Sequence, residues 1–295
     1  MQFNKRSLTV DEQINLLLER GLLIPDFEKA AHYLSHLNYY RLAAYWLPFE
    51  IDHSTHRFIS GTSFEDVLNL YTFDRKLRLL MIDAIERIEV SVRSTWAHVM
   101  TRRYHPHCHL DRTLFKAKWN YDRHYKIIEK EVLRSTETFI VHLKQKYSES
   151  LPPLWATVEI MTFGQLSNWC SNTRHRQDRN EVAMQYGLDE RILTSLLHHL
   201  TIVRNTCAHH ARFWNREFPV IPKLPKDGLL GLSNQHRRKI YNTLIFTLHL
   251  MDRISPGHSW QARLLKLLDQ HKIETSHMGF PDSWRSLAPW NHQAS

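Results

Sequence analysis

Apolar residues recur every three or four positions along most of the chain, as they do in amphipathic helices. From Ser63 onward this series continues for more than twenty positions and predicts one long helix through Leu77, Met81, Ala84, Ile88, Val92, Trp96 and Val99. On the opposite face, Asp83 precedes Arg87 and Glu89 precedes Arg93 by four residues, the favourable order for helical ion pairs. We therefore interpret that face as solvated and ion-paired.

Capping signals locate the other predicted helices. Thr9 with Glu12 predicts a first helix that Gly21 ends, and similar capping boxes occur at Thr162–Gln165 and Asp178–Glu181. Asp26 begins a helical pattern that runs through Leu37 into an aromatic block before Pro48, which we expect in the core: Tyr39, Tyr40, Tyr45 and Trp46.

The second half of the chain shows two more helical patterns. One covers residues 121–147 and breaks at Pro152-Pro153. The other begins at Asp189, runs through Val203 and a polar cluster at residues 204–216, and is ended by Pro219, Pro222 and Pro225. No segment shows the period-two alternation of a strand, and eight glycines leave few places for tight hairpins. The sequence predicts an all-α fold.

Composition and charge add a domain division and a class of partner. A length of 295 residues suggests about two domains at about 150 residues each, and the content of 42% hydrophobic and 23% charged residues excludes a disordered or fibrous chain. We divide the chain into an N-terminal helical segment (1–62), a helical core (63–220) and a basic C-terminal segment with a tail (221–295). The net charge is +9, of which residues 223–272 supply +6, so a polyanionic partner is plausible.

Cysteine usage and the N-terminus indicate a cellular compartment. Cys108, Cys170 and Cys207 are widely spaced and form no CxxC pair, which argues against zinc or redox chemistry and is typical of a reducing cytosol. Residues 1–6 lead into a charged helical pattern, and no run approaches the roughly 18 apolar residues of a membrane span. We expect a cytoplasmic protein without a membrane anchor.

The most informative polar cluster follows the apolar helix that Asp189 begins. Asn205 and His209 are four residues apart and share a helix face, whereas Arg204 lies about 140° from His209 around the axis. Three arrangements would bring the two side chains together: the long arginine side chain reaches around the helix, the helix end is distorted, or a second subunit completes the site. An imidazole acid or base and a guanidinium that stabilises phosphoryl charge together support phosphodiester cleavage without a metal. The alternative is a helix end whose basic side chains complement its dipole.

Three other groups of residues permit two interpretations each. The imidazole and thiol side chains of His105–His109 are of the kinds that bind zinc. Alternating side chains in a loop point in different directions, however, which favours a surface loop over a metal site. Cys207 invites a metal or nucleophile role, whereas its place in the apolar pattern favours a small buried residue. The aromatic and basic residues of 116–126 either stack on unpaired bases or form a snorkelling helix face.

The polar cluster also carries a family resemblance. The string from Leu200 to Arg216, LTIVRNTCAHHARFWNR, resembles the signature of the Abi family of abortive-infection proteins, the AbiD/AbiF-like group. Other stretches agree with it in the same order over residues 10–250, at 38–49, 73–78 with 84–89, and 154–159 with 163–166.

The resemblance implies a HEPN-like helical bundle with additional N- and C-terminal helices. Active relatives are metal-independent endoribonucleases that use an R-x4-6-H motif across a homodimer, act as toxins in phage defence, need no cofactor and resemble systems restrained by a small antitoxin RNA. Transferred to this chain, Arg204 steadies the scissile phosphate, His209 handles the proton and Asn205 orients one of them. The match also implies RNA-contacting or packing roles for four residues after the histidine: His210, Arg212, Asn215 and Arg216. Weaker candidates for the same roles are Arg75 and Arg78, beside Glu86 and Glu89.

Two other functions remain compatible with the sequence. The same fold can be an RNA-binding module without catalysis, or an interaction protein whose basic surface is incidental. The endoribonuclease and the RNA-binding module both predict RNA binding that weakens steeply with salt, whereas the interaction protein does not.

Overall fold

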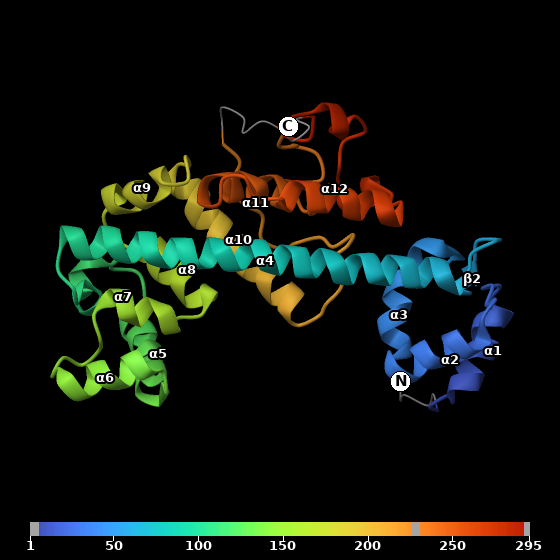
Figure 1. The fold of residues 1–295 in the computed structure, drawn as a ribbon, viewed down its shortest axis with the longest axis horizontal. Coiled ribbons are helices and arrows are strands. Elements are labelled where there is room, and N and C mark those ends of the chain that lie inside the picture. The colour runs from blue at the N-terminus through green and yellow to red at the C-terminus, as the bar shows by residue number, and fades with distance from the viewer. Residues whose placement is uncertain (1–5, 226–230, 292–295) are drawn as a thin grey trace. The chain divides into compact units, whose positions relative to one another are not determined.

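The computed structural model describes residues 6–225 and 231–291. Residues 1–5 of the N-terminal segment and two charges of the basic stretch, Lys226 and Asp227, lie outside these residues. Within them the regular secondary structure is helical apart from one very small sheet, so the predicted all-α class is confirmed (Figure 1). None of the described helices is both long enough and apolar enough to cross a membrane.

The chain packs into two compact units. Unit 1 comprises Met1–Leu77 with Leu265–Ile273, and unit 2 comprises Arg78–Leu264 with Glu274–Ser295. The long predicted helix is α4 (Phe64–Arg103), whose first residues belong to unit 1 and whose remainder belongs to unit 2. The division at residues 62 and 220 stays a prediction.

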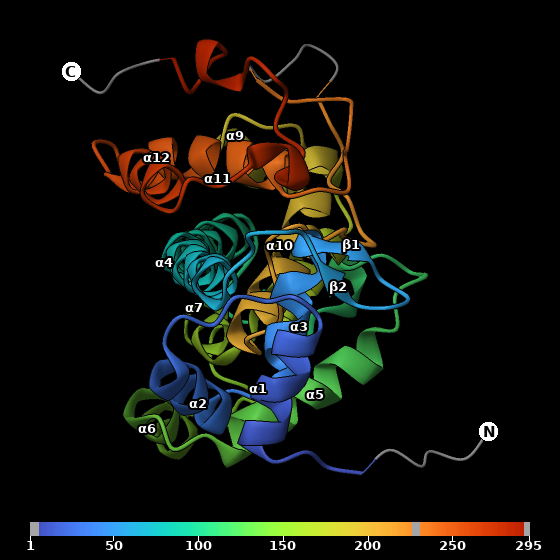
Figure 2. The same ribbon diagram turned by 90° about the vertical axis from the view of Figure 1, so that its right-hand side faces the viewer.

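Unit 1 is built from three short helices that lie beside one another (Figure 2): α1 (Val10–Glu19), α2 (Phe27–His36) and α3 (Tyr39–Trp46). The predicted capping box is present, because Glu12 N donates to Thr9 Oγ1 at 3.2 Å and Thr9 N donates to Glu12 Oε2 at 2.8 Å. Gly21 follows the helix end with a φ of +90°, a left-handed conformation that glycine adopts without strain.

Unit 1 shows two features that the sequence patterns do not predict. The pattern that begins at Asp26 is not one helix, because it breaks at Leu37 and Asn38 caps α3 by accepting from Tyr40 N at 2.8 Å. In consequence Tyr40 is 72% exposed, whereas Tyr45 and Trp46 are buried as expected. The chain also forms an antiparallel pair of strands, β1 (Glu50–Asp52) and β2 (Arg57–Phe58), which are too short for a period of two to be visible in the sequence.

Unit 2 holds the remainder of α4 and most of the other helices: α5 (Tyr121–Arg134), α6 (Thr138–Lys146), α7 (Leu154–Thr157), α8 (Phe163–Asn172), α9 (Arg176–Met184), α10 (Glu190–Ala208), α11 (Tyr241–Ile254) and the start of α12 (Trp260–His271). The capping box of α8 and the Asp189 cap of α10 are present as predicted. The core lies where α10 packs on α8 and α9, and its fully buried side chains include Trp169, Leu196, Leu197 and Leu200.

Three boundaries in unit 2 differ from the prediction. The helix expected over 121–147 is divided, because Ser135 accepts from Glu137 N and so offers the backbone a bond outside the helix. The expected cap Asp178 lies inside α9, where its buried carboxylate binds Arg103 at 2.8 Å and Tyr104 at 2.8 Å. The helix expected to reach the prolines after residue 216 ends at Ala208 instead.

The ion-paired face of α4 is present but only partly solvated. Arg87 lies 3.3 Å from Asp83, and both side chains are partly exposed. Arg93 pairs with Glu89, yet these two side chains are only 14% and 13% exposed, and Arg93 also donates to the backbone oxygens of Glu159 and Met161. This second pair therefore ties α4 to the segment before α8.

Candidate functional site

The candidate site lies at the carboxyl end of α10. Asp189 caps the start of this helix by accepting from Arg191 N at 2.8 Å, and apolar side chains on one face hold it in the core of unit 2. Because the helix is fixed along its whole length, its last turn and the residues after it have a defined place. The polar cluster of the sequence falls at this end (Figure 1).

The end of α10 has the bonding pattern of a Schellman motif. His209 is the C-cap, His210 N donates to the Cys207 oxygen at 3.1 Å, and Ala211 N donates to the Thr206 oxygen at 3.0 Å. His210 occupies the left-handed position with a φ of +57°, where glycine is usual. The backbone that carries His209 is thus held by three consecutive hydrogen bonds, counting His209 N to the Asn205 oxygen at 2.9 Å.

Three predicted catalytic residues present polar atoms at this end of the helix. Asn205 and His209 are exposed, and Arg204 is half-buried. Arg204 Nη1 donates to Asn205 Oδ1 at 3.2 Å, which turns the guanidinium toward the helix face that Asn205 shares with His209. Within residues 6–225 and 231–291 no hydrogen bond joins the side chains of Arg204 and His209, and the guanidinium is held by the Asn205 amide instead.

Arg204 also borders a groove of about 270 Å³ against α4. The other lining residues come from α4 and combine apolar and charged side chains: Ile82, Ile85, Glu86, Glu89, Val90 and Arg93. Glu89 and Arg93 neutralise each other. Glu86 is exposed, and in the described part of the chain no ion pair engages it. The groove therefore brings the two predicted glutamates of α4 beside the motif arginine.

The residues after His209 fold back on the helix. Asn215 has a φ of +52°, and its Oδ1 accepts from Lys239 Nζ. Arg216 donates to the Arg212 oxygen at 3.3 Å, and its guanidinium lies 6.0 Å from the centre of the Phe218 ring. Phe213 and Trp214 are buried. Asn215 and Arg216 therefore hold the loop, while His210 is exposed at its start.

The two arginines predicted on α4 lie in different surroundings. Arg78 is only 5% exposed, and its Nη1 donates to the Ala211 oxygen at 3.5 Å. Burial makes a direct RNA contact by Arg78 incompatible with this conformation, so we assign it to support of the loop after His209. Arg75 is exposed and belongs to unit 1. The structure thus brings Arg78 to the motif loop and leaves the RNA contact of Arg75 a prediction.

The histidine and cysteine segment at 105–109 was expected on the surface, and this was wrong for two of its residues. Cys108 and His109 are fully buried. Burial raises the pKa of Cys108 to about 12 and lowers that of His109 to about 3, so both groups are neutral at physiological pH. No three His, Cys, Asp or Glu side chains among the described residues are grouped so that they can hold a metal ion.

Two other ambiguous features have packing roles. Cys207 is 3% exposed, as the interpretation of a small buried residue required. In the segment 116–126 the ring of Trp119 packs 4.9 Å from Trp169 and 4.8 Å from His124, and Lys116 donates to the Ser171 oxygen at 2.6 Å. These three side chains contact unit 2 itself, and the stacking of unpaired bases on the segment stays a prediction.

Sequence reasoning missed an exposed apolar face beside the site. Leu79 is 57% exposed and Val90 is 50% exposed, and helical geometry places them with Ile82 and Glu86 on one side of α4. Their signal was present in the sequence, because these apolar residues lie off the series that predicts the core. Lys239, in contrast, gave no local sign of its contact with Asn215.

Comparison with known proteins identifies one family. The family model described as "Abi-like protein" matches residues 32–215, which include the whole motif helix and the loop after it up to Asn215. No curated protein and no solved structure matches the chain.

Proposed function

Because the chain belongs to the Abi-like protein family, whose name indicates abortive-infection defence, we propose that it is a metal-independent endoribonuclease toxin of such a system. The observation that carries the proposal is the arrangement at the end of α10. Arg204 is bound to Asn205, and Asn205 shares its helix face with the exposed His209. The proposal includes a HEPN-like bundle as the scaffold.

The proposed chemistry uses the RNA itself as nucleophile. His209 takes the proton of a ribose 2′-hydroxyl, the 2′-oxygen attacks the adjacent phosphorus, and the bond from phosphorus to the 5′-oxygen breaks. The products are a 2′,3′-cyclic phosphate and a 5′-hydroxyl, whose proton comes from a second acid. Arg204 donates hydrogen bonds to the phosphoryl oxygens as their negative charge increases, and Asn205 holds the guanidinium in place.

We propose that the active form is a homodimer. The mechanism requires a second acid, and within the described residues of one chain the arginine and the histidine share no hydrogen bond. The face formed by Leu79, Ile82 and Val90 adjoins the groove of Arg204, and a second copy packed on it brings two motifs together. Exposed apolar surface next to a functional group is typical of an interface.

Introducing charge on this face should therefore separate the subunits. We expect Leu79→Asp with Val90→Asp to shift the protein from twice the chain mass to the chain mass in analytical ultracentrifugation at micromolar concentration, with loss of cleavage. The matched control is Met184→Asp, because Met184 is 74% exposed on α9. A wild-type chain that is monomeric under these conditions contradicts the dimer.

The direct test of function is cleavage of total cellular RNA by the purified wild-type protein in EDTA. We expect cleavage, with 2′,3′-cyclic phosphate at the product ends, because no step requires a metal. Binding of RNA without cleavage supports the non-catalytic module instead, and the absence of both supports an interaction protein.

We further propose that a small RNA restrains the activity. The chain carries a net charge of +9, and a polyanion bound near the motif both neutralises this charge and excludes substrate. Copurification of a discrete short RNA with the wild-type protein, and increased cleavage after its removal at high salt, are the expected results.

A further inference from the structure

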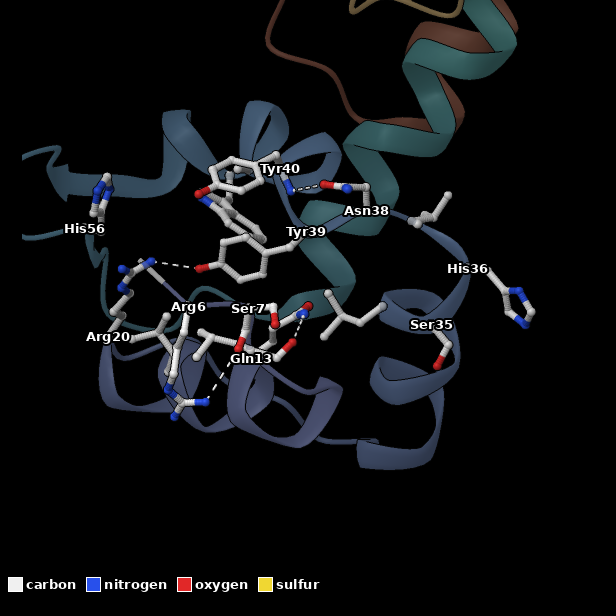
Figure 3. Close-up of a pocket in the computed structure, with 16 residues that line it drawn as sticks. Arg6, Ser7, Gln13, Arg20, Ser35, His36, Asn38, Tyr39, Tyr40 and His56 are labelled. Carbon is white, nitrogen blue, oxygen red and sulfur yellow. Dashed lines mark hydrogen bonds between the residues drawn. The ribbon is translucent and has the colours of Figure 1, made fainter. Parts of the chain in front are cut away.

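Unit 1 contains a cavity of about 850 Å³ that the motif chemistry does not use (Figure 3). Its walls come from the segment before α1, from α1 itself, from the end of α2 and from α3. All of these elements belong to unit 1, so the cavity is complete within that unit.

Basic side chains form part of the cavity wall. Arg6, Arg20, His36 and His56 line it, and none of the described lining residues is acidic. Arg6 is neutralised by Glu12 from outside the cavity, at 2.7 Å, and His56 lies 3.1 Å from Glu50. Arg20 makes no ion pair with any described carboxylate, and its Nη1 donates to the Tyr39 hydroxyl at 2.9 Å. Arg20 therefore supplies an uncompensated positive charge for an anion.

Aromatic rings line the cavity next to Arg20. Tyr39 packs edge-on against Tyr40, with centroids 5.9 Å apart, and against Trp46, at 4.9 Å. Trp46 is buried, whereas Tyr40 is 72% exposed. Figure 3 shows the rings of Tyr39 and Tyr40 on the side of the cavity that faces Gln13 and Arg6. Tyr40 thus offers a ring on which a flat ligand can stack.

We propose that this cavity binds an unpaired nucleotide of an RNA strand, with the base stacked on Tyr40 and a backbone phosphate on Arg20. Stacking and a phosphate-binding cation are the usual means by which proteins hold single-stranded RNA. The inference rests on the proposed function only for the class of ligand, which is RNA.

The test measures binding rather than cleavage. The dissociation constant is measured by fluorescence anisotropy with a labelled ten-nucleotide strand of A, in the His209→Ala background. Tyr40→Ala should weaken binding of this strand by about 10-fold, since one base–aromatic stack is lost. Tyr40→Phe should bind as the parent does.

The control is Tyr147→Ala, because Tyr147 is an exposed tyrosine of unit 2. If Tyr40→Ala and Tyr147→Ala bind the A strand equally, the cavity is not the site, whether or not the wild type cleaves RNA. If free AMP displaces the A strand at a similar concentration, the occupant is a mononucleotide and the assignment to a strand is wrong. Binding of the A strand that Tyr40→Ala weakens, in a protein that cleaves no RNA, supports the cavity and contradicts only the proposed function.

Discussion

Replacing His209 by alanine should lower the rate constant of RNA cleavage by at least about 100-fold. A positioned acid or base contributes about 10²–10⁴-fold to such reactions, and His209 is the exposed imidazole on the face of Asn205. The helix end should remain intact, because the capping bonds at His209 and His210 use backbone atoms. Single-turnover cleavage with excess enzyme, together with thermal unfolding of each variant, checks both statements.

His198→Ala is the matched control, since His198 is an exposed histidine on the same helix. It should cleave at the wild-type rate. Arg204→Lys keeps the charge but loses the planar fork that bonds Asn205 and the phosphate, so it should also cleave slowly. If the His209→Ala and His198→Ala variants cleave equally fast, His209 has no part in the chemistry and the proposed mechanism is wrong.

Local signals predicted much of the fold because their causes are local. Thr9, Thr162 and Asp189 cap helices as expected, since each side chain bonds backbone atoms two or three residues away. Asp178 has the same pattern but does not cap. Its carboxylate is buried against Arg103 and Tyr104, and these contacts across more than 70 residues of sequence decide where α9 begins.

In the candidate site, too, local features could be predicted from the sequence and contacts between distant residues could not. The spacing of Arg204, Asn205 and His209 follows from helix geometry, and it can be read from the sequence. The support of the loop cannot, because Arg78 reaches the Ala211 oxygen across 133 residues. The exposure of Tyr40 also escaped prediction, since an aromatic residue in an apolar pattern is usually buried and only the break at Asn38 turns it outward.

Acid should destabilise the protein as the pH falls from about 6.5 to about 4, because His199 is buried in its neutral form. Its side chain is on α10 and is 1% exposed. Nδ1 lies 2.7 Å from the Val220 oxygen and Nε2 lies 2.8 Å from Thr243 Oγ1. A carbonyl oxygen can only accept, so Nδ1 carries the proton and Nε2 accepts from the Thr243 hydroxyl. The ring therefore joins α10 to the chain after the motif loop and to α11.

Burial lowers the pKa of His199 to about 4, although the bond to Val220 acts in the opposite direction. Above pH 6.5 the imidazole is neutral in both the folded and the unfolded chain, and its contribution to stability is complete. Between pH 6.5 and pH 4 only the unfolded chain binds the proton, so the free energy of unfolding falls as the pH falls. The loss from this one group is about 3 kcal/mol. His109, whose pKa is lowered to about 3, adds to it with the same sign.

Urea unfolding at a series of pH values measures this loss, with tryptophan fluorescence as the signal. His199→Asn should be less stable than the wild type at pH 7, since it loses buried packing, but its stability should fall less steeply between pH 6.5 and pH 4. The difference in slope isolates the titration from the lost contacts, because packing does not depend on pH. His198→Ala should keep the wild-type slope, since that side chain is exposed. A slope unchanged by His199→Asn means that the buried imidazole is not what couples the fold to protons.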